Sequence, residues 1–178
     1  MELHPLIPDD REKISRLLSQ VNVFSNEEIR VALEVIDESL NGAGKKDYQV
    51  FCAFDGDRNL AGFICFGPIP MTEKCYDLYW IKVDEASSRQ GVGGTLLGFM
   101  EEFVAREGAR RIYAETSSSP PYAAARSFYE MHGYRVVSLL KDFYRDGDHK
   151  MIFMKEVRCG AMKKGQISFA ENGPLCHQ

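Results

Sequence analysis

Hydrophobic residues recur along this chain with two spacings, one helical and one extended, and turn-forming residues separate them. A helix is predicted after Asp9 or Asp10, where four apolar residues share one face: Ile14, Leu17, Leu18 and Val21. A second helix should begin at the capping box of Ser25 and Glu28 and end at Asn41-Gly42. Its inward face would consist of Ile29, Leu33, Ile36 and Leu40.

Strand-like and helical segments alternate over the rest of the chain. The predicted strands are residues 48–54, 60–66, 76–83, 111–116, 134–140 and 150–156. Asp55–Asn59 and Asp146-Gly147 mark hairpins between the first two strands and the last two. A helix should follow the glycines at 91–94, and another should open at Ser119 with two prolines behind it. This order predicts an α/β protein with layered α and β elements.

Composition narrows the class of protein. A chain of 178 residues with 44% hydrophobic and 27% charged residues is expected to form one globular domain. The net charge of −4 and the absence of a basic stripe argue against a nucleic-acid partner, and no apolar run is long enough for a membrane span. Five cysteines without a C-x-x-C pair, and no signal peptide, favour a reduced cytoplasmic protein. The four histidines are scattered, so no metal site is expected.

The residues from Ser88 to Thr95 form a glycine-rich turn that runs into a helix. The apolar face of that helix would be Leu96, Leu97, Phe99, Met100, Phe103 and Val104. Glycines let an anion approach the backbone, and the first turn of a helix offers free N–H groups at the positive end of its dipole. An anion site is therefore predicted at Arg89, Gln90, Gly91, Val92, Gly93, Gly94 and Thr95.

Other phosphate motifs fit this chain less well. A dinucleotide fingerprint would need a glycine where Leu96 stands. The nearest match to a Walker A loop, residues 42–46, has Lys46 in place of Ser or Thr and follows a helical pattern. A plain glycine-rich connector at 91–94 is the remaining alternative.

A second segment, Ala125 to Tyr134, predicts a helix that ends at Gly133 and carries Tyr129 on its last turns. Together the two segments resemble the GNAT superfamily of acyl-CoA-dependent N-acetyltransferases. The order of elements is similar to the GNAT fold over about residues 3–157. The resemblance implies a mixed, mostly antiparallel central sheet flanked by helices, with residues 1–157 as the acetyltransferase domain.

The resemblance also implies acetyl-CoA as a co-substrate and assigns residues to it. The family loop pattern, Arg/Gln-x-x-Gly-x-Gly/Ala, puts its glycines at Gly91 and Gly93 and its first position at Ser88, which has no long basic side chain. Arg89 would serve instead by gripping a phosphate. The backbone of Ile81, Lys82 and Val83 would pair with the pantetheine arm and polarise the thioester carbonyl.

Acyl transfer to an amine needs a base for the amine and an acid for the departing thiolate. The resemblance assigns the acid to Tyr129. The helical spacing predicts that its neighbour, Phe128, is the better core residue. Many relatives carry an asparagine where this chain has Tyr122. It places a carboxylate base at Asp77, whose alternative reading is a surface aspartate. Glu115 is the second candidate, because two carboxylates facing one cleft would bind a cationic amine and raise one pKa.

The expected activity is acetyl transfer to a small-molecule or peptide amine. The helices at residues 9–41 and the last hairpin should line the acceptor pocket, the latter with Asp142, Phe143, Tyr144, Asp146 and Asp148. Tyr79 and Trp80 should point to opposite sides, one to the core and one to the cleft. A CoA-binding sensor with little catalysis, and transfer of a longer acyl group, are the alternatives. The tail, residues 158–178, is expected to be loosely ordered or to pack on a second subunit in a homodimer.

Overall fold

The computed structural model describes residues 1–20, 24–42 and 47–157. The helices are α1 (Arg11–Ser19), α2 (Asn26–Leu40), α3 (Val92–Arg106) and α4 (Ala123–Met131), with short 3₁₀ turns η1 (Pro8–Asp10) and η2 (Pro120–Tyr122). The strands are β1 (Glu2–Pro5), β2 (Gln49–Phe54), β3 (Leu60–Pro68), β4 (Cys75–Val83), β5 (Arg111–Ser117), β6 (Arg135–Arg145) and β7 (Asp148–Glu156). None of the helices in these ranges is long and apolar enough to cross a membrane.

The described strands form one sheet in the order β1-β2-β3-β4-β5-β7-β6. All neighbouring pairs are antiparallel except β4 and β5, which run parallel. The parallel pair is joined by α3, since a crossover connection is needed to bring the chain back to the same end of the sheet. The predicted fold class, a mixed and mostly antiparallel sheet flanked by helices, is confirmed.

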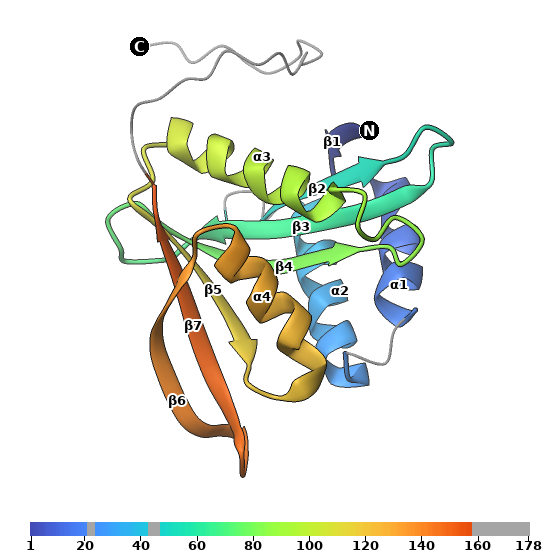
Figure 1. Ribbon diagram of the computed structural model, residues 1–178. Coiled ribbons are helices and arrows are strands. Elements are labelled where there is room, and N and C mark those ends of the chain that lie inside the picture. The colour runs from blue at the N-terminus through green and yellow to red at the C-terminus, as the bar shows by residue number, and fades with distance from the viewer. Residues whose placement is uncertain (21–23, 43–46, 158–178) are drawn as a thin grey trace.

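The helices cover the two faces of the sheet unequally (Figure 1). On one face α3 and α4 bury a cluster that includes Leu96, Ile112 and Phe153. On the other face α1 and α2 pack on β2, β3 and β4, around Ile14 and Ile36. The second cluster contains no residue of β5, β6 or β7, so that part of the face is left without a helix.

The central feature of the sheet is the separation of β4 from β5. Their pairing runs from Cys75–Arg111 to Leu78–Ala114, and beyond this point no described strand pairs with β4 on its β5 side. Figure 1 shows the two strands diverging from there. In the same region the register between β3 and β4 shifts, with Cys65 opposite Trp80 and Phe66 opposite Leu78. Tyr79 is thus the extra residue of a β-bulge, which bends the strand and re-aims its side chains.

Several predicted elements differ in detail from the observed ones. The prediction missed β1, because Glu2–Pro5 has no alternation and contains a proline; the strand forms by pairing with β2 at the sheet edge. The prediction that Tyr79 and Trp80 point to opposite sides was wrong, since the bulge turns both onto the α1–α2 cluster. β6 extends to Arg145 and so includes Phe143 and Tyr144. Val21, predicted on the first helix, and the whole tail lie outside the described residues.

Two glycines give a matched test of how tightly β4 is held. A Cβ at Gly62 would lie 2.7 Å from the backbone oxygen of Lys82, whereas a Cβ at Gly98 in α3 would meet nothing within 4 Å. We expect Gly62→Ala to lower the free energy of unfolding by about 1–3 kcal/mol through overpacking. Gly98→Ala should raise it by up to about 1 kcal/mol, because alanine favours a helix. Urea denaturation of both variants measures this; equal effects would show that Gly62 tolerates a side chain.

Candidate active site

A cleft opens where β4 leaves β5, on the face covered by α3 and α4. It has a volume of about 590 Å³. Its walls are the end of β4, the glycine turn, the start of α3 and one side of α4. The lining residues are Ile81, Val83, Ser87, Ser88, Arg89, Gly91, Val92, Gly93, Gly94, Ala124, Ala125, Phe128, Tyr129, Met131 and His132. The two segments singled out in the sequence therefore meet in one cavity.

The glycine turn ends in an uncapped helix start. Gly91 adopts the left-handed conformation, with φ of 81°, at the N-cap of α3, and no side chain caps the helix. Arg89 also has a positive φ, 63°, so its backbone is held in a conformation that non-glycine residues rarely adopt. The first bond into the helix runs from the Thr95 N–H to the Gly91 carbonyl. The N–H groups before Thr95 have no intrahelical acceptor, and a helix of 15 residues presents them at the positive end of its dipole.

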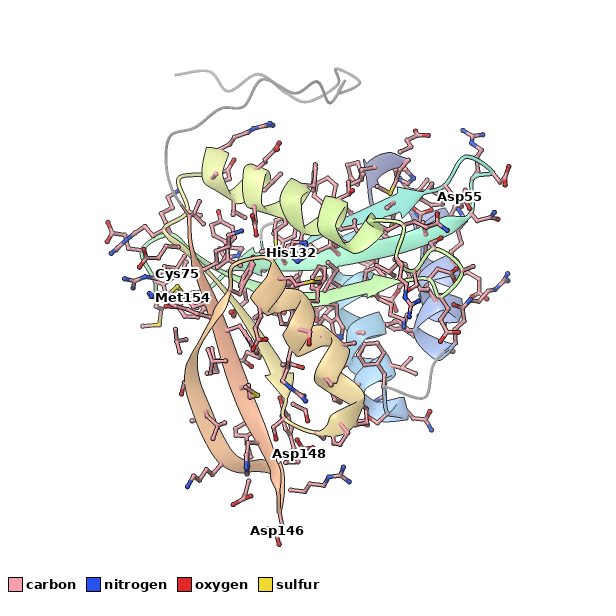
Figure 2. The ribbon with its side chains drawn as sticks, viewed as in Figure 1. Asp55, Cys75, His132, Asp146, Asp148 and Met154 are labelled. Carbon is pink, nitrogen blue, oxygen red and sulfur yellow. The ribbon has the colours of Figure 1, made fainter. Side chains whose placement is uncertain are left out.

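Gly93 and Gly94 also let α4 approach α3 closely. A Cβ at Gly93 would lie 3.2 Å from the ring of Phe128, and one at Gly94 would lie 3.2 Å from Nε2 of His132. These glycines thus serve packing as well as access to the backbone. His132 is fixed from its other side, because its Nδ1 lies 2.8 Å from the Phe128 carbonyl and must donate to it. In Figure 2 His132 marks the end of α4 that lies beneath α3.

Tyr129 lines the cleft and is 7% exposed. Its ring packs against Phe128, Tyr134 and Phe153. Burial raises its pKa to about 12, so the phenol stays protonated at neutral pH. The prediction that Phe128 is the better buried of the two residues was wrong: Phe128 is only partly buried, because it leans across the cleft onto Gly93.

The carboxylates lie on the opposite face of the sheet, in the part that has no helix. Asp77 is on β4 and is level with Tyr113 of β5, two residues before Glu115. Burial and the nearby Glu115 raise the pKa of Asp77 to about 6, although Lys150 opposes this. The ammonium group of Lys150, on β7, forms an ion pair with Glu115. Asp77 therefore changes its protonation state close to neutral pH.

Two side-chain hydrogen bonds link the elements around this end of the sheet. The Tyr122 hydroxyl donates to Glu28 at 2.7 Å, which ties the start of α4 to the start of α2. The Ser117 hydroxyl donates to the buried carboxylate of Asp148 and thereby fixes the β6–β7 hairpin to the end of β5. Figure 2 shows Asp148 near the lower end of that hairpin and Asp146 at its tip.

The predicted site residues do not all lie in the cleft, since Asp77 and Glu115 are on the opposite face of the sheet. Eight of the predicted cofactor residues line the cleft: Ile81, Val83, Ser88, Arg89, Gly91, Val92, Gly93 and Gly94. The side chains of Lys82, Gln90 and Thr95 point elsewhere: Lys82 toward the ring of Phe24, Gln90 to the Ala86 carbonyl and Thr95 to the Gly91 carbonyl. The roles given to Tyr129, Asp77 and Glu115 stay predictions.

Two residues of this region were not predicted from the sequence. His132 lines the cleft, and a spacing of four from Phe128 could have placed it on the same side of the helix. Lys150 pairs with Glu115 across two strands, and no local pattern in the sequence predicts that pairing. The described residues contain no group of three or more His, Cys, Asp or Glu side chains that could hold a metal ion.

A second cavity, of about 630 Å³, lies along the outer half of α3 and β7. Its charged residues include Glu101 and Lys155, which pair with each other at 2.7 Å. We assign the site to the first cleft, because that cleft contains the helix N-terminus and the buried phenol and lies beside the opening between β4 and β5.

Comparison with known proteins identifies the family. Residues 14–134 match the model of the acetyltransferase (GNAT) family. The chain belongs to this family. Its GNAT acetyltransferase domain contains both the glycine turn and Tyr129, and the resemblance noted in the sequence is confirmed. The protein is an acyltransferase enzyme.

Solved structures agree with this assignment. A protein described as a GNAT-family acetyltransferase from Desulfovibrio desulfuricans is 37% identical with a TM-score of 0.83, over 88% of this chain and 99% of that one. An aminoglycoside 6′-N-acetyltransferase complexed with coenzyme A is 19% identical, with a TM-score of 0.70 over 89% and 98% of the two chains. The ribosomal-protein-S18-alanine N-acetyltransferase of Escherichia coli is 18% identical, with a TM-score of 0.70 over 93% and 99%. The last two show the fold alone. A search of curated protein sequences found no match.

The raised pKa of Asp77 can be tested without any substrate. We expect the Asp77 carboxyl to titrate near pH 6 in a carbon-detected NMR titration, with Asp77→Asn used to assign its signal. Glu115→Gln should lower this pKa, because the like charge is removed and Lys150 is left free to pair with Asp77. A pKa near 3.8 in the wild type would contradict the proposed environment.

Proposed function

We propose that this protein transfers the acetyl group of acetyl-CoA directly to an amine acceptor, a small molecule or a peptide. The observation that carries the proposal is the opening between β4 and β5. On one side of the sheet it borders a cleft with an uncapped helix start and a buried phenol. On the other side it borders Asp77 and Glu115. A thioester and an amine arriving from opposite faces would meet at this opening.

The cleft suits the phosphate-bearing end of acetyl-CoA. The first-turn N–H groups of α3 would donate to the pyrophosphate, and Arg89 at the rim would add a charged contact. The cleft is also lined by the apolar residues Ile81, Val83 and Phe128, which would bury the pantetheine arm. The β4 backbone beyond Leu78 has no strand on its β5 side among the described residues, so its N–H and C=O groups can pair with amides of that arm.

The acceptor amine would approach from the face that carries the carboxylates. A lysine-type amine has a reference pKa of about 10.4 and must lose a proton before it attacks. Asp77, with a pKa of about 6, is ionised at pH 7 and would accept that proton directly or through water. The amine nitrogen then bonds to the acetyl carbon while the carbon–sulfur bond breaks. A backbone N–H of β4 at residues 81–83, beyond the Tyr79 bulge, would stabilise the oxyanion.

The departing thiolate needs a proton, and Tyr129 is the group we assign to supply it. Its protonated phenol lines the cleft, and the free thiol reference pKa of about 8.5 lies between neutral pH and that of Tyr129. Because the pKa of the phenol lies above that of the thiol, Tyr129 would first stabilise the thiolate by a hydrogen bond, then donate its proton and regain one from solvent as the product leaves. Support for catalysis over a purely binding role comes from this buried phenol and from the family assignment.

Acetyl-CoA binding is expected to stabilise the fold. At a ligand concentration near 100 times the dissociation constant, the gain should be about 2.7 kcal/mol, measured as a thermal shift. Arg89→Glu should raise the dissociation constant about 10- to 100-fold, the scale of one charge-assisted hydrogen bond. Arg58→Glu is the matched control, because Arg58 also has a positive φ, 64°, but lies in the β2–β3 hairpin. No shift for the wild type, or equal losses in both variants, would contradict the site.

Tyr129→Phe should lower kcat by on the order of 10²-fold, the scale of a lost general acid, with little change in acetyl-CoA affinity. The matched control is Tyr134→Phe, since Tyr134 is also buried, 3% exposed, packs against Tyr129 and does not line the cleft. The control should keep full turnover. Steady-state kinetics with the best amine from a screen separates the two. A Tyr129→Phe enzyme with unchanged kcat would exclude the phenol as the acid.

A further inference from the structure

Lys150 already occupies the place where the proposed function needs the acceptor's ammonium group. Its residue on β7 lies opposite Ser117 of β5, so its side chain is a diagonal neighbour of Glu115 on the same face of the sheet. Its ammonium group forms an ion pair with the Glu115 carboxylate and lies 4.8 Å from the centroid of the Phe143 ring. Only 17% of the Lys150 side chain is exposed.

The contacts of Lys150 are those that a protein offers to an alkylammonium ligand. A carboxylate neutralises the charge, and the face of an aromatic ring attracts the cation through its quadrupole. The lysine side chain is itself a primary ammonium on a four-carbon chain. A cationic acceptor would therefore have to compete with Lys150 for Glu115.

Lys150 also affects the neighbouring carboxylate. The titratable groups around Asp77 are Tyr79 on its own strand, Glu115 on β5 and Lys150 on β7. Tyr144 of β6 lies near Glu115. Glu115 raises the pKa of Asp77, and Lys150 lowers it. Loss of the lysine charge would leave Glu115 unpaired and so make Asp77 a stronger base that ionises at higher pH.

We propose that Lys150 is a specificity-determining residue of the acceptor site, whose ammonium group weakens the binding of cationic amines by competing with them for Glu115. This inference rests on the proposed function, because it takes the Asp77–Glu115 face as the acceptor's side. The lysine lets the enzyme hold a cationic acceptor loosely and keeps Asp77 ionised at neutral pH.

Lys150→Met tests the inference, because methionine keeps an unbranched apolar chain and removes the charge. With n-butylamine as acceptor, we expect KM to fall about tenfold, on the scale of a freed carboxylate. The rising limb of the pH profile of kcat should move to higher pH. KM for a neutral acceptor, such as an arylamine, should not change. Lys150→Arg keeps the charge and should keep the wild-type KM for n-butylamine.

Lys155→Met is the matched control for charge removal on the same strand. Lys155 also pairs with a glutamate, Glu101, and lies 5.5 Å from the centroid of an aromatic ring, that of Tyr134. It faces the second cavity and not the carboxylate pair. This variant should show the wild-type KM and pH profile. A lower KM in both variants would assign the effect to net charge and overturn the inference.

A binding measurement separates this inference from the proposed function. Calorimetry with n-butylammonium and the enzyme saturated with CoA does not require acetyl transfer. Tighter binding to Lys150→Met than to the wild type supports the inference even if no amine is acetylated. The lack of acetylation would count against the proposed function only. The opposite result is that both enzymes acetylate n-butylamine, with the same KM and the same affinity for Lys150→Met and the wild type. This result would overturn the inference and leave the proposed function standing.

Discussion

The loss of pairing between β4 and β5 beyond Leu78 and Ala114 is the constraint on which the rest of the site depends. Two strands that stayed paired would give a closed sheet with no passage between its faces. Because they separate, the β4 backbone beyond Leu78 pairs with no described strand along this edge, and buried backbone groups need partners. The bulge at Tyr79 bends β4 directly after Leu78, where its pairing with β5 ends. The sheet is thus built with an edge that an extended ligand can complete.

The unequal coverage of the sheet gives the two faces different chemistry. On the α3–α4 face, Tyr129 lies in an apolar environment that raises its pKa, so the phenol stays protonated at neutral pH. On the other face the helices stop at β4, and carboxylates on β4 and β5 remain in partial contact with water. The buried phenol and the half-buried carboxylate, which we propose as acid and base, are therefore kept apart by the sheet itself. Environments that push two pKa values apart in this way are typical of acid–base pairs in enzymes.

Much of the fold could be predicted from the sequence, because the responsible interactions are local. The capping box of Ser25 and Glu28 is present at α2, and the glycine turn leads into α3 with five of the six predicted apolar residues buried. The features that could not be predicted depend on contacts with residues distant in the sequence. β1 forms only because β2 offers an edge, and the Tyr79 bulge arises from the register with β3. The deeper burial of Tyr129 over Phe128 follows from how closely α4 approaches α3.

In the candidate site, too, local features could be predicted from the sequence and pairings between distant residues could not. The cleft residues 88, 89, 91, 92, 93 and 94 lie within one short segment, so a loop pattern could find them. The Glu115–Lys150 pair joins residues 35 positions apart through the insertion of β7 between β5 and β6. That insertion brings a cation and an aromatic ring to the carboxylate face, where the sequence alone suggested only acidic and aromatic residues. On the face that we propose for the acceptor, the local charge therefore depends on which side chains the strand order brings together.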